Sequence, residues 1–284
     1  MHIHGGNIYK QEVKADFSAN LNLLGMPKKV EEAAIEGVRA SIHYPDPENK
    51  RLREKLGEFH GINQDWIVCG NGAAELIFAF AQTVKPQKAL VLAPSFYEYE
   101  QALKSVHCKL KVYPLKKDHE FILDQEILEE DFNGLDALFL CNPNNPTSQL
   151  IESKLLEEII QKCEKTQTFC VLDECFLPFV ECGEERSGIK LLQNPYLIIL
   201  RAFTKTYAMP GIRLGYLISS NIQLLEQMKE GLQPWNVSVV AQYAGVAALE
   251  LEGFLEDTRK ELGIQKIFIT DLLQECNYKI LGKD

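Results

Sequence analysis

The chain has 284 residues, of which 46% are hydrophobic and 25% are charged, and its formal net charge is −10. These proportions are typical of a folded globular protein and exclude a disordered or collagen-like chain. The excess of 40 acidic over 30 basic side chains argues against a nucleic-acid-binding surface, which needs a positive field, but leaves room for a local basic pocket that binds a phosphorylated small molecule.

Two helices are expected near the N-terminus. The first covers PKKVEEAAIEGVRA (27–40), which carries a proline in its first turn, and YPDP (44–47) breaks it. The second covers NKRLREKLGEFHG (49–61) and stops at Gly61.

Between residue 65 and about residue 220, short apolar runs alternate with helical stretches. The strand-like runs are WIVCG, ALVLA, KLKVY, ALFLC, TFCVLD, YLIILRA and RLGYLIS. Several are continuously apolar, which is typical of parallel strands covered on both faces. The pattern predicts an α/β, doubly wound, three-layer αβα domain with a mostly parallel sheet.

The remainder of the chain reads as helical. Helices are expected at 221–232, 237–253 and 253–276, and Tyr278–Leu281 looks like the opening of another strand.

Neither a membrane partner nor a metal site is expected. No apolar run approaches the roughly 20 residues that span a bilayer, and the first residues lack the apolar stretch of a signal peptide. Cys69, Cys141 and Cys170 lie in strand-like runs, which favours buried thiols in a cytoplasmic protein. His2 and His4 have no acidic or cysteine neighbour that would complete a metal site.

Polar groups follow three of the predicted strands, at the edge where open α/β sheets bind their ligands. ALFLC is followed by NPNNPT (142–147), TFCVL by Asp173, and YLIILRAF by Lys205, with Arg213 a little further on. A fourth feature, GNG (70–72), precedes a helix and offers backbone N–H groups and the positive end of that helix to an anion.

Each feature also has a simpler interpretation. The glycine turn is common in α/β folds, NPNNPT could be only a rigid loop, Asp173 could only cap the next turn, and Lys205 could be a solvated surface lysine. Together, however, they describe one site: a carboxylate for a pyridinium nitrogen, a lysine for a Schiff base, and glycine amides, a hydroxyl and an arginine for a phosphate. These are the requirements of pyridoxal phosphate chemistry.

At these residues the sequence resembles the fold-type I, pyridoxal-phosphate-dependent aminotransferase superfamily (class I/II). Within it, the sequence is similar to the branch of threonine-phosphate decarboxylase and histidinol-phosphate aminotransferase. The resemblance is carried by HGGN (4–7), DFSANLNLLGMP (16–27), YPDP (44–47), GNGAAE (70–75), APSF (93–96), NPNNPT (142–147), DECF (173–176), FTKTYAMPGIRLGY (203–216) and PWNVS (234–238). The HGGN start, the LGMP stretch and PWNVS favour the decarboxylase side, whereas YPDP and NPNNPT are shared by both.

The resemblance implies how the cofactor, pyridoxal 5'-phosphate, is held. Lys205 is the Schiff-base lysine and proton shuttle, and Asp173 pairs with the pyridine nitrogen. Asn145 binds the 3-oxygen of the ring, and Phe96 stacks on the ring face. The residues implied to hold the cofactor phosphate are Gly72, Ala73, Ala74, Thr204 and Arg213.

The resemblance also implies a homodimer with a shared active site, because Tyr44 would reach the cofactor phosphate of the neighbouring subunit. On the substrate side, His4 and Asn20 or Asn22 would line the site, with His4 meeting a substrate phosphate. Asn236, in PWNVS, lies near the active site or the dimer contact by resemblance; alternatively it is the N-cap of the following helix.

Two positions depart from the pattern of the family. Phe176 stands where many aminotransferases carry a tyrosine, so a hydroxyl donor to the 3-oxygen is missing and Asn145 is its main partner. Ser148 takes a backbone position that is commonly given to glycine.

The leading functional hypothesis is decarboxylation of a phosphorylated amino acid, such as O-phosphothreonine, in cobalamin biosynthesis. The alternative is a histidinol-phosphate-type aminotransferase, because the same machinery serves both reactions and the orientation of the substrate decides between them. A third possibility is a protein that binds the cofactor without turnover.

The resemblance divides the chain into three parts. Residues 1–40 form an N-terminal arm and small-domain segment, 41–250 the cofactor-binding large domain, and 251–284 the start of a C-terminal small domain. Family members continue further and supply an arginine for the substrate carboxylate, so we expect an incomplete small domain, weak or absent turnover, and uncovered apolar surface on the helix at 253–275.

Overall fold

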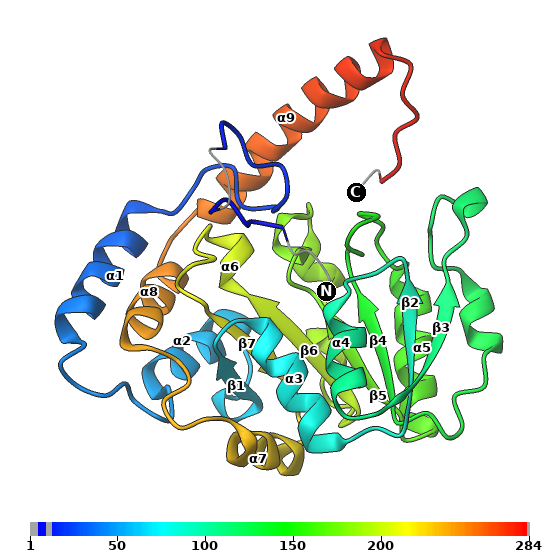
Figure 1. The fold of residues 1–284 in the computed structure, drawn as a ribbon, viewed down its shortest axis with the longest axis horizontal. Helices are drawn as coiled ribbons and strands as arrows, with labels where there is room; N and C mark the ends of the chain where they lie inside the picture. The colour runs from blue at the N-terminus through cyan, green and yellow to red at the C-terminus, as the bar shows by residue number, and fades with distance from the viewer. Residues whose placement is uncertain (1–4, 10–12, 283–284) are drawn as a thin grey trace.

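Seven strands form one sheet in the order β1-β7-β6-β5-β4-β2-β3 (Figure 1). We describe it from a computed structural model, and the description covers residues 5–9 and 13–282. The strands are β1 (Ile67–Gly70), β2 (Lys88–Ala93), β3 (Lys109–Pro114), β4 (Ala137–Cys141), β5 (Phe169–Asp173), β6 (Leu197–Ala202) and β7 (Gly215–Ile218). β7 is antiparallel to both neighbours, and the other adjacent pairs are parallel. The prediction of a mostly parallel sheet is confirmed.

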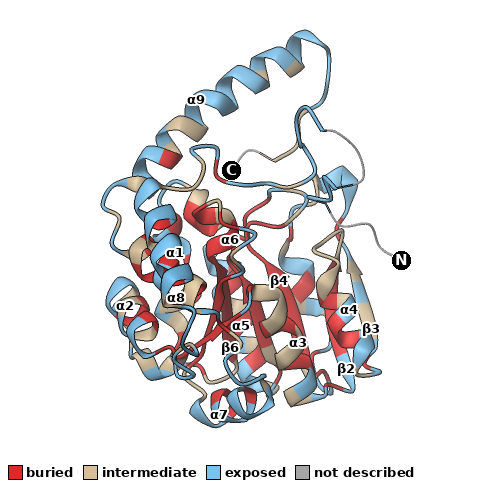
Figure 2. Ribbon diagram, turned by 60° about the vertical axis from the view of Figure 1, so that its left-hand side comes forward, coloured by how far each residue is buried: buried red, intermediate tan, exposed pale blue. Residues whose placement is uncertain are grey.

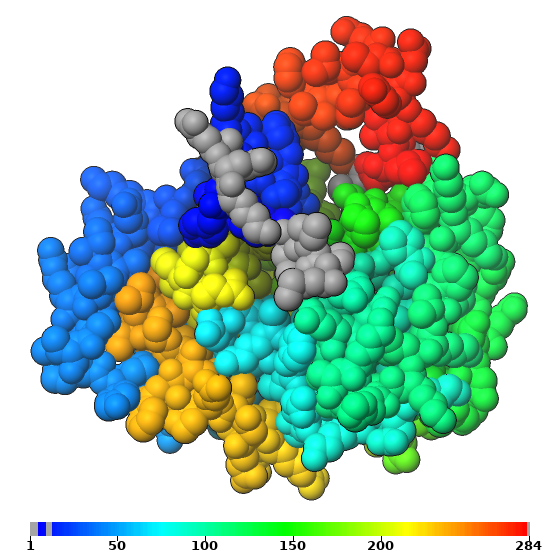
Figure 3. All heavy atoms as spheres, in the orientation of Figure 1, coloured from blue at the N-terminus to red at the C-terminus, as the bar shows by residue number. Residues whose placement is uncertain are grey.

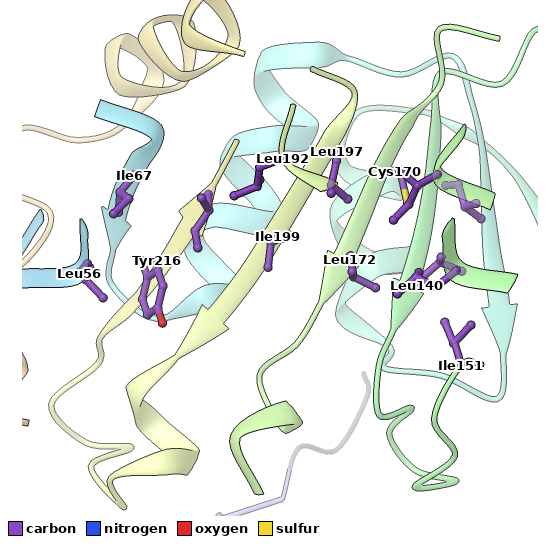
Figure 4. Close-up of a cluster of buried hydrophobic side chains, with 14 of the residues drawn as sticks. Leu56, Ile67, Leu140, Ile151, Cys170, Leu172, Leu192, Leu197, Ile199 and Tyr216 are labelled. Atoms are coloured by element: carbon purple, nitrogen blue, oxygen red, sulfur yellow. The ribbon is translucent and has the colours of Figure 1, made fainter. Parts of the chain in front are cut away.

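The continuous apolar runs of the central strands build a core on both faces of the sheet. Successive residues of a strand point to opposite faces, so Leu140 of β4 joins one hydrophobic cluster and its neighbour Phe139 joins the other. Ile199 and Ile198 of β6 divide in the same way. Figure 4 shows part of the first cluster, with Leu140, Leu172 and Ile199 projecting from three neighbouring strands. Each such side chain stabilises the fold by about 1.5–3 kcal/mol.

Helices cover both faces, which confirms the three-layer prediction. On the face of Phe139 lie α3 (Ala73–Val84), α4 (Glu98–Ser105) and α7 (Ile222–Gly231). On the face of Leu140 lie α1 (Lys28–Ala40), α2 (Lys50–His60), α5 (Ser153–Lys165) and α8 (Val239–Leu249). A short helix, α6 (Phe203–Thr206), directly follows β6. None of the described helices has the length and apolar character needed to cross a membrane.

The glycine that follows α2 acts as expected. Gly61 takes a left-handed φ of +64° at the end of α2, which is the usual role of glycine there.

Cys69, Cys141 and Cys170 are buried and free, as their strand-like surroundings predict.

The last helix, α9 (Phe254–Glu275), extends away from the sheet, and most of it is exposed (Figure 2). Its exposed apolar side chains are Ile264, Ile267, Phe268, Ile269 and Leu272, in agreement with the expected uncovered surface. The predicted strand at Tyr278–Leu281 is wrong. This segment is irregular because it lies outside the sheet, and its backbone pairs with no strand among the residues that the structure describes.

Candidate functional site

The strand ends bring the predicted site residues to one edge of the sheet. The parallel strands β1, β6, β5, β4 and β2 all end at this edge, and the antiparallel β7 begins there. The register shows this directly, because Gly215 at the start of β7 pairs with Gly70 at the end of β1 and with Ala202 at the end of β6. Segments that follow five different strands and precede a sixth therefore become neighbours.

Asp173 is the last residue of β5, and its carboxylate is buried and hydrogen-bonded. The Oδ1 atom accepts the backbone N–H of Cys175 at 2.9 Å, and Oδ2 accepts the hydroxyl of Tyr99 at 2.7 Å. Asp173 thus does cap the next turn, as the simpler interpretation held, but it also presents a buried acceptor at the edge of the sheet.

Tyr99 is a site residue that the sequence did not reveal. It lies on α4, is 1% exposed, and its ring packs edge-on against Phe96 with the ring centroids 5.4 Å apart. Burial raises the pKa of the Tyr99 phenol, and the nearby Asp173 raises it further, so the hydroxyl stays a donor. The sequence shows only that a tyrosine lies three residues after Phe96. Its role depends on the packing of α4 beside β5, which brings the Tyr99 hydroxyl to Asp173.

We expect Tyr99→Phe to lower the free energy of unfolding by about 1.5–3 kcal/mol, since a buried carboxylate loses a donor. Chemical denaturation without added ligand measures this change. Tyr278→Phe is the control, because Tyr278 is 67% exposed and should change stability by less than about 0.5 kcal/mol. Equal stability of the two variants would contradict the assigned role of the hydroxyl.

Lys205 lies on α6, just beyond the end of β6, and its side chain is half-buried. Burial lowers the pKa of the Lys205 ammonium, and the positive charge of Arg213 acts in the same direction. A lower pKa leaves more of the amine in its neutral, nucleophilic form at a given pH. This half-buried position is not that of a solvated surface lysine.

Gly72 and Arg213 come together where α3 begins. Gly72 has a φ of +83°, and a Cβ added there would lie 2.6 Å from the Nη2 atom of Arg213. Arg213 itself adopts a left-handed φ of +63°, a conformation that costs about 1 kcal/mol for a residue with a side chain. Gly215 allows this approach, because a Cβ at that position would lie 2.4 Å from the amide nitrogen of Ala73. The result is a cationic cup at a helix N-terminus, which suits an anion.

The loops that follow β2 and β4 complete the edge. Phe96 and Asn145 are both half-buried in these loops. The side chain of Asn144 joins them by donating to the Pro94 carbonyl at 3.0 Å and accepting the Ser95 hydroxyl at 2.9 Å. In the same region Ser148 takes a φ of +59°, so the prediction of a glycine-like backbone position for this serine is confirmed.

Tyr44 lies on the surface, in contact with the segment that precedes α8. It is 79% exposed and stacks on Trp235, with the ring centroids 4.5 Å apart. Asn236 is not the N-cap of the next helix, because Ser238 caps α8. Instead, the Asn236 amide donates to the carboxylate of Glu75 in the first turn of α3, at 2.7 Å, so this segment lies beside the anion cup.

The residues expected on the substrate side have different environments. Asn20 is exposed, and His4 lies outside the described residues. Asn22 is buried, and its amide donates to the Thr206 carbonyl at 2.8 Å and to the Thr258 hydroxyl at 2.9 Å. Its backbone N–H donates to the carbonyl of Lys205, and Figure 3 shows the N-terminal segment lying on the segment that carries α6. Asn22 therefore ties three parts of the chain together.

These features fit a ligand with a phosphate at one end and a nitrogen-containing ring at the other. The cup of Gly72 and Arg213 suits the phosphate, and the buried Asp173 carboxylate can accept a hydrogen bond from a protonated ring nitrogen. Lys205 supplies an amine at the same edge of the sheet, where the loops that follow the strands begin. The fold and site define an α/β enzyme of the kind that uses a pyridine cofactor.

Comparison with known proteins agrees with this class of enzyme. The family model described as aminotransferase class I and II matches residues 12–284. The threonine-phosphate decarboxylase of Salmonella typhimurium is 38% identical over 256 residues, which cover 87% of this chain and 70% of that protein. Histidinol-phosphate aminotransferase 2 of Carboxydothermus hydrogenoformans is 33% identical over 257 residues, which cover 89% and 70%. The crystal structure of the histidinol-phosphate aminotransferase from Clostridium acetobutylicum has a TM-score of 0.82 at 29% identity, covering 90% of this chain and 76% of that one.

The chain belongs to the class I and II aminotransferase family. Enzymes of this family depend on pyridoxal phosphate, and this is the cofactor of the present chain. The resemblance that its motifs suggested is therefore confirmed at the level of the family.

Proposed function

We propose that this protein is a pyridoxal-phosphate-dependent carboxy-lyase that acts on a phosphorylated amino acid, in the manner of an L-threonine-O-3-phosphate decarboxylase of cobalamin biosynthesis. The observation that carries this choice is the 38% identity to the Salmonella typhimurium decarboxylase over 87% of the chain. A protein described as a putative threonine-phosphate decarboxylase, from Caldanaerobacter subterraneus, is 36% identical over 98% of the chain and adds support.

Lys205 and Asp173 have the central roles in this proposal. The bound cofactor supplies an electron sink for the bond that is cleaved in the substrate. Lys205 binds the cofactor covalently and then delivers or removes a proton, a task that its lowered pKa favours. Asp173 accepts the ring N–H and keeps that nitrogen protonated, while Tyr99 and the backbone of Cys175 hold its carboxylate in place.

The ring and the phosphate of the cofactor are held by the surrounding loops. We assign Asn145 to the 3-oxygen of the ring and Phe96 to the ring face, since both are half-buried in loops at the edge of the sheet. The residues assigned to the phosphate are Gly72, Ala73, Ala74, Thr204 and Arg213. The close approach of the Arg213 guanidinium to Gly72 supports this assignment.

Gly72→Ala should weaken binding of pyridoxal phosphate by about tenfold. The added methyl group pushes the Arg213 guanidinium aside, and the charged hydrogen bond that Arg213 is proposed to donate to the cofactor phosphate is lost. A titration followed by absorption measures the dissociation constant. Gly61→Ala is the matched control: Gly61 also has a positive φ, +64°, but has no atom within 4 Å of the added Cβ. Both variants should lose similar stability, and similar cofactor affinity in both would count against the cup.

The substrate is proposed to bind beside the N-terminal segment, where His4, Asn20 and Asn22 were expected. Asn22 already donates both of its amide hydrogens within the chain. We therefore assign it to holding this segment against α6, and leave direct contact with the substrate to the exposed Asn20 and to His4.

A homodimer is part of the proposal. Large apolar side chains are exposed over α1, the loop after it, the segment before α8 and α8 itself, and monomeric proteins rarely leave so many together. They are Val38, Ile42, Tyr44, Trp235 and Tyr243. The exposed Tyr44 is thereby free to reach the cofactor phosphate of the partner subunit. Buried free thiols support the proposed cytoplasmic location.

The test is to incubate the purified protein, saturated with pyridoxal phosphate, with O-phosphothreonine and to measure carbon dioxide. We expect slow release of carbon dioxide, in line with the weak turnover expected from the sequence, and its loss in Lys205→Ala. A second reaction contains histidinol phosphate and a keto acid. Amine exchange in that reaction, without carbon dioxide in the first, would reverse the order of the two candidates.

The second candidate, a histidinol-phosphate-type aminotransferase, is supported by the relative from Carboxydothermus hydrogenoformans at 33% identity and by the structural neighbour from Clostridium acetobutylicum. The third, a protein that binds the cofactor without turnover, would show cofactor absorption but neither reaction. The two assays and the absorption spectrum together separate all three.

A further inference from the structure

A buried network of charges lies between the ends of β5 and β6. The side chains of Glu174 and Arg201 are 0% and 2% exposed, and Glu174 Oε2 lies 2.7 Å from an Arg201 Nη2 and 3.0 Å from its Nε. Glu184 accepts two further hydrogen bonds from the same guanidinium, at 2.9 and 3.2 Å. Ser187 and Gly188 each donate to the Glu174 carboxylate at 2.8 Å.

The two central members of this network are attached to the strands that carry the proposed catalytic groups. Glu174 directly follows Asp173, and its backbone N–H donates to the Leu200 carbonyl at 2.9 Å, which continues the pairing of β5 with β6. Arg201 is the next-to-last residue of β6, shortly before Lys205 on α6. The ion pair therefore joins the two chain segments on either side of the site.

Stability alone does not account for these buried charges. Removing two charges from water costs several kcal/mol per ion, and apolar residues of similar size often stabilise a core at least as well. A fully hydrogen-bonded polar network, however, holds its members in one arrangement more strictly than apolar packing does. All three guanidinium nitrogens of Arg201 are hydrogen-bonded, so this network meets that condition.

We propose that the Glu174–Arg201 ion pair is a positioning device that fixes the end of β5 relative to the end of β6. The ion pair sets the distance between Asp173 and Lys205. In the proposed function, Asp173 holds the ring nitrogen and Lys205 binds the cofactor covalently. Neither Glu174 nor Arg201 touches the cofactor in this proposal; they act through their neighbours. The inference rests on the roles proposed above for Asp173 and Lys205.

Glu174→Gln and Glu184→Gln form a matched pair of variants. Each removes one carboxylate from Arg201, but only Glu174 is joined to β5 beside Asp173. Each purified variant is titrated with pyridoxal phosphate, and the visible absorption and circular dichroism of the bound cofactor are recorded. We expect Glu174→Gln to weaken binding by about tenfold or more, as for other supporting residues around bound groups, and to shift the dichroism band. Glu184 is 46% exposed, so Glu184→Gln should stay within about threefold of wild type.

A double variant separates positioning from stability. Glu174→Gln leaves Arg201 beside a neutral amide and is expected to lose stability. Glu174→Gln with Arg201→Met removes the two buried charges and should recover much of it, because the remaining Glu184 carboxylate is 46% exposed and can be hydrated. The proposal predicts that the double variant folds but still binds the cofactor weakly, with the shifted dichroism band.

Wild-type affinity and dichroism in the double variant would overturn the proposal, as would equal affinities of Glu174→Gln and wild type. If Glu174→Gln fails to fold, the double variant decides. Failure of the wild-type protein itself to bind pyridoxal phosphate through Lys205 would count against the proposed function instead.

Discussion

Lys205→Ala should abolish the visible absorption band that develops when the protein is mixed with pyridoxal phosphate, and should lower turnover by roughly 10⁴-fold or more. Lys205 is the half-buried amine at the edge of the sheet, and burial lowers its pKa. No other group can replace its covalent bond to the cofactor in this proposal. An absorption titration measures the first effect, and release of carbon dioxide from O-phosphothreonine measures the second.

Lys229→Ala is the control for this experiment. Lys229 lies on α7, at the end of the sheet opposite to α6 (Figure 1), so its removal should leave both the band and the turnover unchanged. A band that persists in Lys205→Ala and disappears in Lys229→Ala would show that the covalent lysine has been assigned wrongly.

Asp173→Asn should leave the covalent bond to Lys205 intact but lower turnover by about 10²–10³-fold, within the range for a residue that controls a proton. The neutral amide can still accept one hydrogen bond, from Tyr99 or from the backbone of Cys175. It cannot balance the charge of a protonated ring nitrogen, so the ring becomes a weaker electron sink. Steady-state rates at saturating cofactor measure the loss.

Asp136→Asn is a matched control at the other end of a neighbouring strand. Asp136 precedes β4 and accepts two backbone N–H groups, from Gln87 at 2.7 Å and Lys88 at 2.9 Å. Its replacement should affect stability but not the rate per folded molecule. Equal rate losses in the two variants would indicate a general effect of disturbing the sheet and would remove the special role of Asp173.

Much of the fold follows from local sequence. Runs such as ALFLC predict buried strands because they are apolar on both faces, and Gly61 predicts the end of α2 because glycine adopts a positive φ without strain. The wrong prediction at Tyr278–Leu281 has a different cause. A strand needs a partner for its backbone, and local propensity cannot supply one.

The site was predictable only in part. Asp173 and Lys205 follow apolar strands, so the general rule about strand ends places them at one edge, and the family resemblance gives them roles. Tyr99, Glu174 and Arg201 act through partners far away in the sequence, such as the Tyr99 hydroxyl on Asp173. Such contacts form only through tertiary packing, and no local sequence pattern predicts them. Asn236 illustrates the same limit, because its partner is Glu75 rather than the helix that follows it.

The antiparallel strand β7 also has a consequence for folding kinetics. It inserts between β1 and β6, so the cup of Gly72 and Arg213 joins segments from the first and the last parts of the sheet. Contacts between such distant segments form late, because a long loop must close before they contribute free energy. Recovery of cofactor affinity during refolding should therefore lag behind recovery of secondary structure.

The same contact links the cofactor to thermal stability. Bound pyridoxal phosphate should raise the melting temperature in a concentration-dependent way, because it binds only the chain in which this contact has formed.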